Sequence, residues 1–200
     1  MYNDKMYWRF WLLLVVGIFF LLWAFKGFNF DSSIIVTALS AGGITLFIEK
    51  IVFKLLIWKC CPDIFYPWLS NIPYIGGQWE GEIQSDFIFP DTGKIGEPIP
   101  AKIEIRHDFD KICVTLETGS SYSSSYVSDV WIDESKRKYL CYTYYNDADE
   151  NRDTNPNHDG SAKLRVIDNG ELKLVGHYFT GRKTTGKMTF KRISKKNSRA

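Results

Sequence analysis

The chain has 200 residues, a formal net charge of +2 and 45% hydrophobic residues. Its four cysteines form no CxxC pair and have no His/Cys spacing suited to zinc, which excludes a disulfide scaffold and a structural zinc site. Residues 1–68 are dominated by apolar runs, whereas short alternating segments follow Pro73. The roughly 130 residues of the second part suit one compact domain. The sequence therefore predicts one membrane module and one globular module.

The first apolar run extends without a charge over 16 residues, from Phe10 to Phe25, between Arg9 and Lys26. Flanking aromatic residues can extend it to the roughly 20 residues that span a bilayer. We predict a transmembrane helix over about 8–27. A signal peptide is the competing interpretation, but no small-residue cleavage site follows the run and a second span does.

The second apolar run begins after Asp31, and its lysines can reach the interface while the apolar residues stay in lipid. We predict a second helix over about 32–58. The turn of about five residues between the two spans requires an antiparallel hairpin. Lysine and arginine flank both outer ends, so the positive-inside rule places both termini in the cytoplasm. The expected location is a bacterial inner membrane, crossed twice.

The second helix carries small residues at intervals of four, a spacing that lets helices approach closely in lipid. This face either packs inside the hairpin or joins neighbouring copies of the chain. The candidate packing residues are Ser33, Thr37, Ala38, Ala41 and Gly42.

Residues 61–72 read as a proline- and aromatic-rich interfacial linker, and 73–200 as an all-β domain. Eight strand-like segments follow one another with tight turns, of which Asn169–Gly170 is the strongest hairpin signal. No helical pattern interrupts them. We predict an eight-stranded antiparallel up-and-down, lipocalin-like β-barrel. The expected strands are 75–86, 99–107, 110–118, 122–133, 137–147, 160–168, 171–180 and 183–193.

Alternation along these strands predicts the faces that point inward. The inner face of the fourth strand is expected to hold Tyr122, Ser124, Tyr126, Ser128, Val130 and Ile132. Together with the other strands, this gives the barrel interior an aliphatic end and an end rich in Ser, Tyr, Thr and His. A polar end of this kind suits an amphiphilic ligand.

Neither a catalytic constellation nor a metal or cofactor motif is present in the sequence, so we expect no enzyme activity, no metal and no cofactor. Trp79, in the segment GGQWEG at 76–81, is expected to plug one end of the barrel. The polar loop 146–160 and the segment HYFTGRKTTGKM at 177–188 are expected to meet at the other end. Arginine suits phosphates and tyrosine suits bases.

Taken together, the two N-terminal spans, the GGQWEG opening, the eight-strand meander and the closing YFTGR…TGKM resemble the two-transmembrane β-barrel effectors of bacterial CBASS anti-phage systems. This resemblance covers nearly the whole chain. It implies that a cyclic di- or oligonucleotide, made by a CD-NTase after infection, binds the cytoplasmic barrel. It also implies that the effector then forms homo-oligomers and disrupts the inner membrane, which causes abortive infection.

The chemistry of the residues gives a set of candidate ligand contacts at the polar end of the barrel, and we expect no DNA or RNA partner. Two alternatives stay open at this point: a membrane-tethered carrier of a lipid or other hydrophobic ligand, and a tethered scaffold with a filled barrel. The candidate contacts are Ser124, Tyr126, Tyr144, Arg152, His158, Tyr178, Thr180 and Arg182.

Overall fold

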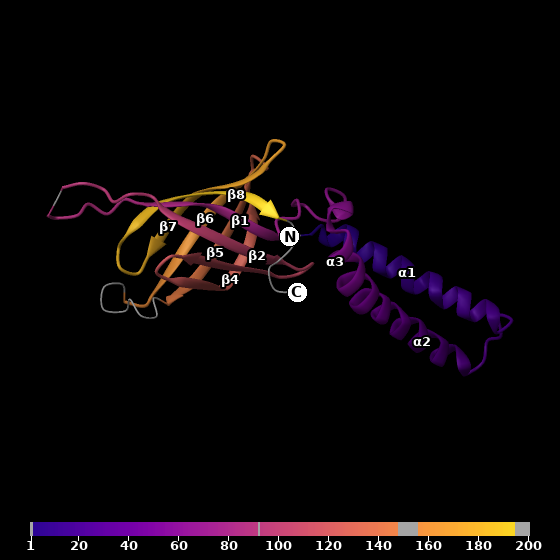
Figure 1. The fold of residues 1–200 in the computed structure, drawn as a ribbon. Coiled ribbons are helices and arrows are strands. Elements are labelled where there is room, and N and C mark those ends of the chain that lie inside the picture. The colour runs from indigo at the N-terminus through magenta and orange to yellow at the C-terminus, as the bar shows by residue number, and fades with distance from the viewer. Residues whose placement is uncertain (1, 92, 148–155, 195–200) are drawn as a thin grey trace. The chain divides into compact units, whose positions relative to one another are not determined.

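The computed structural model describes residues 2–91, 93–147 and 156–194. Its contacts divide the chain into two compact units, Met1–Tyr74 and Ile75–Ala200. The first unit is helical and the second is a β-barrel, as Figure 1 shows.

The first unit is built on a helical hairpin. Helix α1 spans Asp4–Phe25 and α2 spans Ser33–Phe47, which continues as the π-helical segment η1, Ile48–Ile57, and as α3, Trp58–Cys60. A 3₁₀ turn, η2, follows at Pro62–Phe65. The two predicted spans are therefore present as continuous helices of 22 and 28 residues, long and apolar enough to cross a bilayer. Few of their side chains are buried, in contrast to the core helix of a soluble domain.

The small residues of α2 serve two different surfaces. Thr37, Ala41 and Thr45 are buried, on the face of α2 that packs within the first unit. The Thr37 and Thr45 hydroxyls donate to carbonyls one turn earlier in the same helix, at 2.9 and 2.8 Å. Ala38 instead is exposed, and a Cβ at Gly42 would meet nothing within 4 Å. Of the five predicted packing residues, Thr37 and Ala41 are thus buried inside the hairpin, whereas Ala38 and Gly42 lie on a more open side of the helix.

The second unit is a closed barrel in which each strand pairs antiparallel with the next, and β1 pairs with β8. This confirms the predicted fold. The tight turn between β6 and β7 is the predicted one, with Gly170 at a φ of +88° that favours glycine. The strands are β1 Gly77–Ser85, β2 Ile99–His107, β3 Ile112–Thr118, β4 Tyr122–Ile132, β5 Lys138–Asp147, β6 His158–Asp168, β7 Leu172–Thr180 and β8 Thr185–Ser194.

One end of the barrel is filled by side chains, and it is the end where β1 begins. Trp79 and Phe190 are fully buried there. The Trp79 indole donates to the Ile75 carbonyl at 3.1 Å, and the Ile75 amide donates to Nδ1 of His107 at 3.2 Å. Trp79 therefore occupies the plug position that the sequence predicts. Burying a ring of this size contributes several kcal/mol to stability.

The expected inner face of β4 is wrong for the first half of the strand. Ser125 pairs with Tyr144 and Val127 with Thr143, which leaves Tyr126 as an extra residue in a β-bulge. An extra residue reverses the in–out alternation beyond it. As a result Ser123 is buried, whereas Ser124 is exposed and Tyr126 is 61% exposed. The second half, which includes Val130, has the predicted orientation.

Candidate ligand-binding site at the open end of the barrel

The end of the barrel opposite Trp79 holds a cavity of about 750 Å³. This volume is within the range of roughly 300–1,000 Å³ typical of small-molecule sites. A filled barrel has no such space, so the structure contradicts the scaffold alternative. The cavity is bordered by Ile83, Ser85, Phe87, Phe89, Gly96, Glu97, Ile99, Leu116, Thr118, Ser120, Ser121, Ser123, Tyr142, Tyr144, Asn146, His158, Tyr178, Thr180, Arg182, Thr184 and Met188.

Two buried polar atoms of the cavity wall have no hydrogen-bond partner among the described residues. They are the Tyr142 hydroxyl and the Asn146 amide nitrogen Nδ2. The other side-chain atom of Asn146, Oδ1, accepts from the Ser123 hydroxyl at 2.8 Å, which fixes the direction of the amide. An unmet buried donor costs about 1–3 kcal/mol. Two side chains that border the cavity thus each carry a donor that the described residues leave unmet.

Three tyrosine rings from β5 and β7 belong to the wall. The rings of Tyr142 and Tyr144 lie 5.8 Å apart, centroid to centroid, at an interplanar angle of 45°. Burial raises the pKa of Tyr144 to about 12, and burial also raises the pKa of Tyr142. Both phenols are thus protonated at neutral pH and can donate hydrogen bonds. The third ring, Tyr178, borders the cavity from β7.

Glycines on neighbouring strands allow two of these rings to lie flat against the wall. Gly160 pairs with Tyr144, and Gly186 pairs with Tyr178. A Cβ at either glycine would collide with the ring of its partner. The absence of a side chain on β6 and on β8 therefore determines where the tyrosine rings stand.

The rim carries the charged and titratable groups of the site. Arg182 is exposed there, in the turn after β7, and is the one arginine or lysine on the described lining. His158 lies beside it with Nδ1 3.0 Å from the Pro156 carbonyl, so Nδ1 carries the proton that is donated to that oxygen. Burial, and to a smaller extent the Arg182 charge, lowers the pKa of His158. At neutral pH, Arg182 therefore supplies the positive charge and His158 an acceptor at Nε2.

Serine hydroxyls replace part of the backbone ladder between β3 and β4. Backbone pairing is confined to residues 115–117 and 122–124. Beyond it, the Val114 amide donates to the Ser125 hydroxyl at 2.8 Å, and the Ser128 hydroxyl donates to the Ile112 carbonyl. The serine-rich sequence of β4 is explained by this structural role, because the serine hydroxyls close the barrel wall next to the bulge. The partners in both hydrogen bonds are backbone groups of β3.

Five of the eight predicted contact residues meet at the cavity: Tyr144, His158, Tyr178, Thr180 and Arg182. Their contact with a ligand stays a prediction. Ser124 and Tyr126 do not border the cavity, because the bulge reverses which residues at the start of β4 face the barrel interior. Arg152 lies outside the described residues.

Sequence reasoning missed several residues of the wall. Tyr142 lies within the expected strand 137–147, but its sequence does not distinguish a core phenol from one whose hydroxyl lacks a partner. Asn146 sits at the start of the predicted polar loop but belongs to β5. Phe87 and Phe89 lie in the connection between the first two strands, where apolar residues give no period-two signal.

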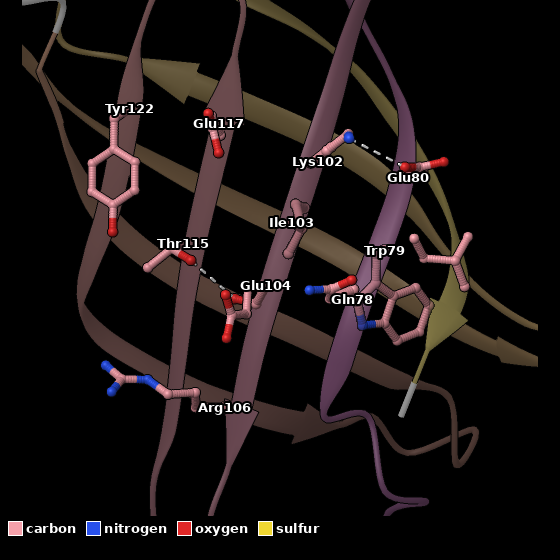
Figure 2. Close-up of a pocket in the computed structure, with 11 residues that line it drawn as sticks. Gln78, Trp79, Glu80, Lys102, Ile103, Glu104, Arg106, Thr115, Glu117 and Tyr122 are labelled. Carbon is pink, nitrogen blue, oxygen red and sulfur yellow. Dashed lines mark hydrogen bonds and ion pairs between the residues drawn. The ribbon is translucent and has the colours of Figure 1, made fainter. Parts of the chain in front are cut away.

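A second, smaller hollow of about 340 Å³ lies on the wall formed by β1–β4 (Figure 2). Its rim is polar and exposed, with Lys102 3.5 Å from Glu80 across two strands. An exposed ion pair of this kind contributes little. No group of three or more His, Cys, Asp or Glu residues within the described parts of the chain is arranged to hold a metal ion. The cavity at the open end is therefore the better candidate site.

A closed barrel with a plugged end and an open, partly polar cavity defines a small-ligand receptor. The sequence model of a family described as "Cap15, cyclic dinucleotide receptor domain" matches residues 70–192. The chain belongs to this family. Its barrel is thus a cyclic dinucleotide receptor domain, and the resemblance to CBASS effectors is confirmed.

Two curated relatives carry the same description, "CD-NTase-associated protein 15". The one from Yersinia aleksiciae is 28% identical over 176 residues, which cover 84% of this chain and 78% of the relative. The one from Staphylococcus schleiferi is 34% identical over 92 residues, or 46% of this chain and 48% of the relative. The first of these similarities extends well beyond the length of the barrel alone.

Proposed function

We propose that the chain is a membrane-anchored receptor and effector, without enzyme activity, whose open-end cavity binds the cyclic dinucleotide. The observation that carries this placement is the pair of unpartnered polar atoms, the Tyr142 hydroxyl and Asn146 Nδ2, on two residues that border the cavity. A nucleobase presents carbonyl and ring-nitrogen acceptors that match both donors. A base that accepts from these donors would offset the cost of leaving them unmet.

The remaining groups of the cavity suit the other parts of such a ligand. Tyr144 and Tyr178 offer flat faces on which bases can stack. Arg182 is suited to a phosphate, because its planar guanidinium binds two oxygens at once. Arg152 is kept as a second proposed phosphate contact, although it lies outside the described residues. A cyclic dinucleotide with two bases and two phosphates uses all of these groups.

The helical hairpin is proposed to anchor the receptor in the bacterial inner membrane, with both termini and the barrel in the cytoplasm. Two long apolar helices with exposed side chains support the anchor. Lysine and arginine before α1 and after α2 support the orientation. A cytoplasmic barrel is accessible to a diffusible signal made by a CD-NTase, and we propose no DNA or RNA partner.

The effector step is proposed to be self-association in the membrane followed by its disruption. The more open side of α2, at Ala38 and Gly42, supports this step because it allows a second helix to approach closely. Ligand binding would favour a state of the barrel that brings copies together. Gly42→Leu is expected to abolish toxicity while leaving insertion and ligand binding intact, and unchanged toxicity would make the hairpin a plain anchor.

Calorimetric titration of the full chain in detergent micelles with a panel of cyclic dinucleotides tests the receptor assignment. We expect saturable binding of at least one member and roughly tenfold or greater weakening by Arg182→Ala. Lys183→Ala, in the same turn but away from the cavity lining, is the matched control. No binding across the panel would overturn the placement of the ligand in this chain.

The apolar part of the wall favours one alternative, a tethered carrier of a lipid or other hydrophobic ligand. Leu116 and Met188 line the cavity deep in the barrel. A purely hydrophobic ligand, however, leaves the buried donors of Tyr142 and Asn146 unmet. Mass spectrometry of ligands that co-purify with the full chain separates the two: stoichiometric lipid in the barrel supports the carrier.

A further inference from the structure

The connection between β1 and β2, described over residues 86–91 and 93–98, forms an arm that extends away from the barrel (Figure 1). Its two limbs pair with each other, through a bridge between Ile88 and Ile95 and a hydrogen bond of 3.0 Å from the Phe89 amide to the Lys94 carbonyl. The Gly93 amide closes the turn onto the Phe89 carbonyl at 2.8 Å. The arm is therefore a small β-ribbon.

The arm exposes an unusual amount of apolar surface. Phe87 is 46% exposed and Phe89 50%, and Ile88 and Ile95 are exposed to a similar extent. A two-stranded ribbon without a packing partner is marginally stable in water. Exposed apolar residues grouped in this way indicate a binding surface.

The two faces of the ribbon differ in what they border. Phe87 and Phe89 stand on one face, with their rings 5.4 Å apart and edge to face, and both border the cavity. Ile88 and Ile95 are not among the residues that border it. Successive side chains of a strand alternate between faces. One face of the arm thus belongs to the binding site and the other does not.

The base of the arm is fixed to the barrel by polar contacts. The Asp86 amide donates to the Thr185 carbonyl at 2.8 Å, and the Thr185 hydroxyl donates to the Asp86 carboxylate at 3.0 Å. On the other limb, Gln84 Nε2 donates to the Gly96 carbonyl at 2.8 Å. Further from the barrel, the hydrogen bonds of the arm connect its two limbs with each other, between Phe89 and Lys94 and between Gly93 and Phe89. The polar contacts thus fix the root of the ribbon at the rim, and its apolar residues lie beyond that root.

We propose that the arm is a lid that closes over the bound cyclic dinucleotide and brings Phe87 and Phe89 onto the face of a nucleobase. The proposal rests on the proposed function, because it requires the ligand to lie in this cavity. A base suits the arm because its π-face stacks on aromatic rings whatever its identity. Closure also covers apolar surface that is exposed in the open state, so the ligand and the lid stabilise each other.

The test compares two double variants of the full chain in detergent micelles, each on one face of the arm. Phe87→Ala with Phe89→Ala removes the rings that face the cavity, and Ile88→Ser with Ile95→Ser is the matched control. Binding of cyclic di-adenylate, cyclic di-guanylate and cyclic di-uridylate is measured by calorimetry and by dissociation rate. Loss of stacking is expected to weaken the best ligand roughly ten- to a hundredfold, mainly through faster dissociation, with no loss for the control.

Limited proteolysis of the wild-type chain gives a measurement that needs no variant. Trypsin is expected to cleave after Lys94, at the tip of the arm, and a saturating ligand is expected to slow this cleavage at least tenfold. Continued cleavage at the same rate with ligand bound would overturn the lid. An equal loss of affinity in the two double variants, or no loss in the phenylalanine variant, would do the same.

The outcomes also separate the lid from the function on which it rests. If the wild-type chain binds no ligand of the panel, the proposed function fails and the lid fails with it. If the wild-type chain binds normally and removal of both rings changes nothing, the lid alone fails and the cavity stays the binding site.

Discussion

The two ends of the barrel differ in whether their buried polar side chains have hydrogen-bond partners. At the end where β1 begins, the Trp79 indole and the His107 ring both bond to the backbone of Ile75, at 3.1 and 3.2 Å. At the other end, the Tyr142 hydroxyl and Asn146 Nδ2 are buried without a partner among the described residues. One fold thus contains a satisfied end that stabilises the domain and an unsatisfied end that is prepared for a ligand. Four predictions test this division.

The largest effect is expected for Trp79→Ala at the satisfied end. Removing a fully buried ring leaves a large cavity, and the free energy of unfolding should fall by about 3–5 kcal/mol. Chemical denaturation of the full chain in detergent, followed by the β-sheet circular dichroism signal, measures the change. Trp131→Ala is the control, because Trp131 is 51% exposed and should cost far less. Equal losses would show that Trp79 is not the plug.

His107 should make the stability of the barrel depend on pH. Burial lowers the pKa of His107 from 6.5 to about 4. Between these two pH values His107 is protonated in the unfolded chain and neutral in the folded chain. Stability is complete above about pH 6.5 and falls as the pH drops toward 4, by about 3 kcal/mol at 1.36 kcal/mol for each pKa unit.

The measurement is the unfolding free energy between pH 4 and pH 7. His107→Gln should reduce the slope of the curve in this window, with the contribution of His158 left in place, and should lower stability at neutral pH. His177→Gln, at an exposed position on β7, is the control for a histidine-to-glutamine change outside the barrel core. An unchanged slope without His107 would assign the pH dependence to another group.

Tyr142→Phe should change stability and ligand affinity in opposite directions. It removes only the unpartnered hydroxyl, so the unfolding free energy of the empty protein should rise by about 1 kcal/mol. Cyclic-dinucleotide affinity should fall roughly tenfold, since the ligand loses a donor. Thermal unfolding and calorimetry measure the two quantities. Tyr139→Phe, on the outer face of the same strand, is the control, and lower stability in Tyr142→Phe would mean that its hydroxyl is satisfied.

The smallest effect, a change in ligand affinity, is expected for Gly160→Ala. This substitution displaces the ring of Tyr144 but removes no ring from the cavity wall. The new Cβ collides with Tyr144, so this ring must turn toward the cavity. Ligand affinity should fall roughly three- to tenfold, in line with the modest cost of small steric changes. Gly119→Ala is the control, because a Cβ there meets nothing within 4 Å. Unchanged affinity would show that the position of Tyr144 is not set by the neighbouring strand.

The sequence was sufficient for the architecture because the signals involved are local. The two apolar runs, the period-two pattern of the strands and the Asn169–Gly170 turn each need only a few neighbouring residues to be read. The role of Trp79 as a plug followed in the same way, from glycines beside a large ring at the start of a strand. Of the five predicted contact residues that meet at the cavity, Tyr144, Tyr178 and Thr180 stand on regular strands, where the alternation holds.

The same reasoning failed where pairing between strands changes the local pattern. Ser124 and Tyr126 were placed inside the barrel, but one extra residue in β4 reverses their orientation. A bulge of this kind is set by the partner strand and by the serine hydroxyls that bridge to β3, and neither is visible in the alternation of one strand. The sequence also gave no sign that residues 86–91 and 93–98 form a ribbon beside the cavity.

The sequence by itself determined that this protein is a two-helix hairpin followed by an eight-stranded barrel, because hydrophobic period and turn chemistry are properties of short segments. Only the tertiary structure decided which residues of β4 face inward, that Phe87 and Phe89 border the cavity and which donors lack a partner. Those features depend on side chains from strands far apart in the chain, and whether a buried hydroxyl such as that of Tyr142 is satisfied is known only when all of its neighbours are in place.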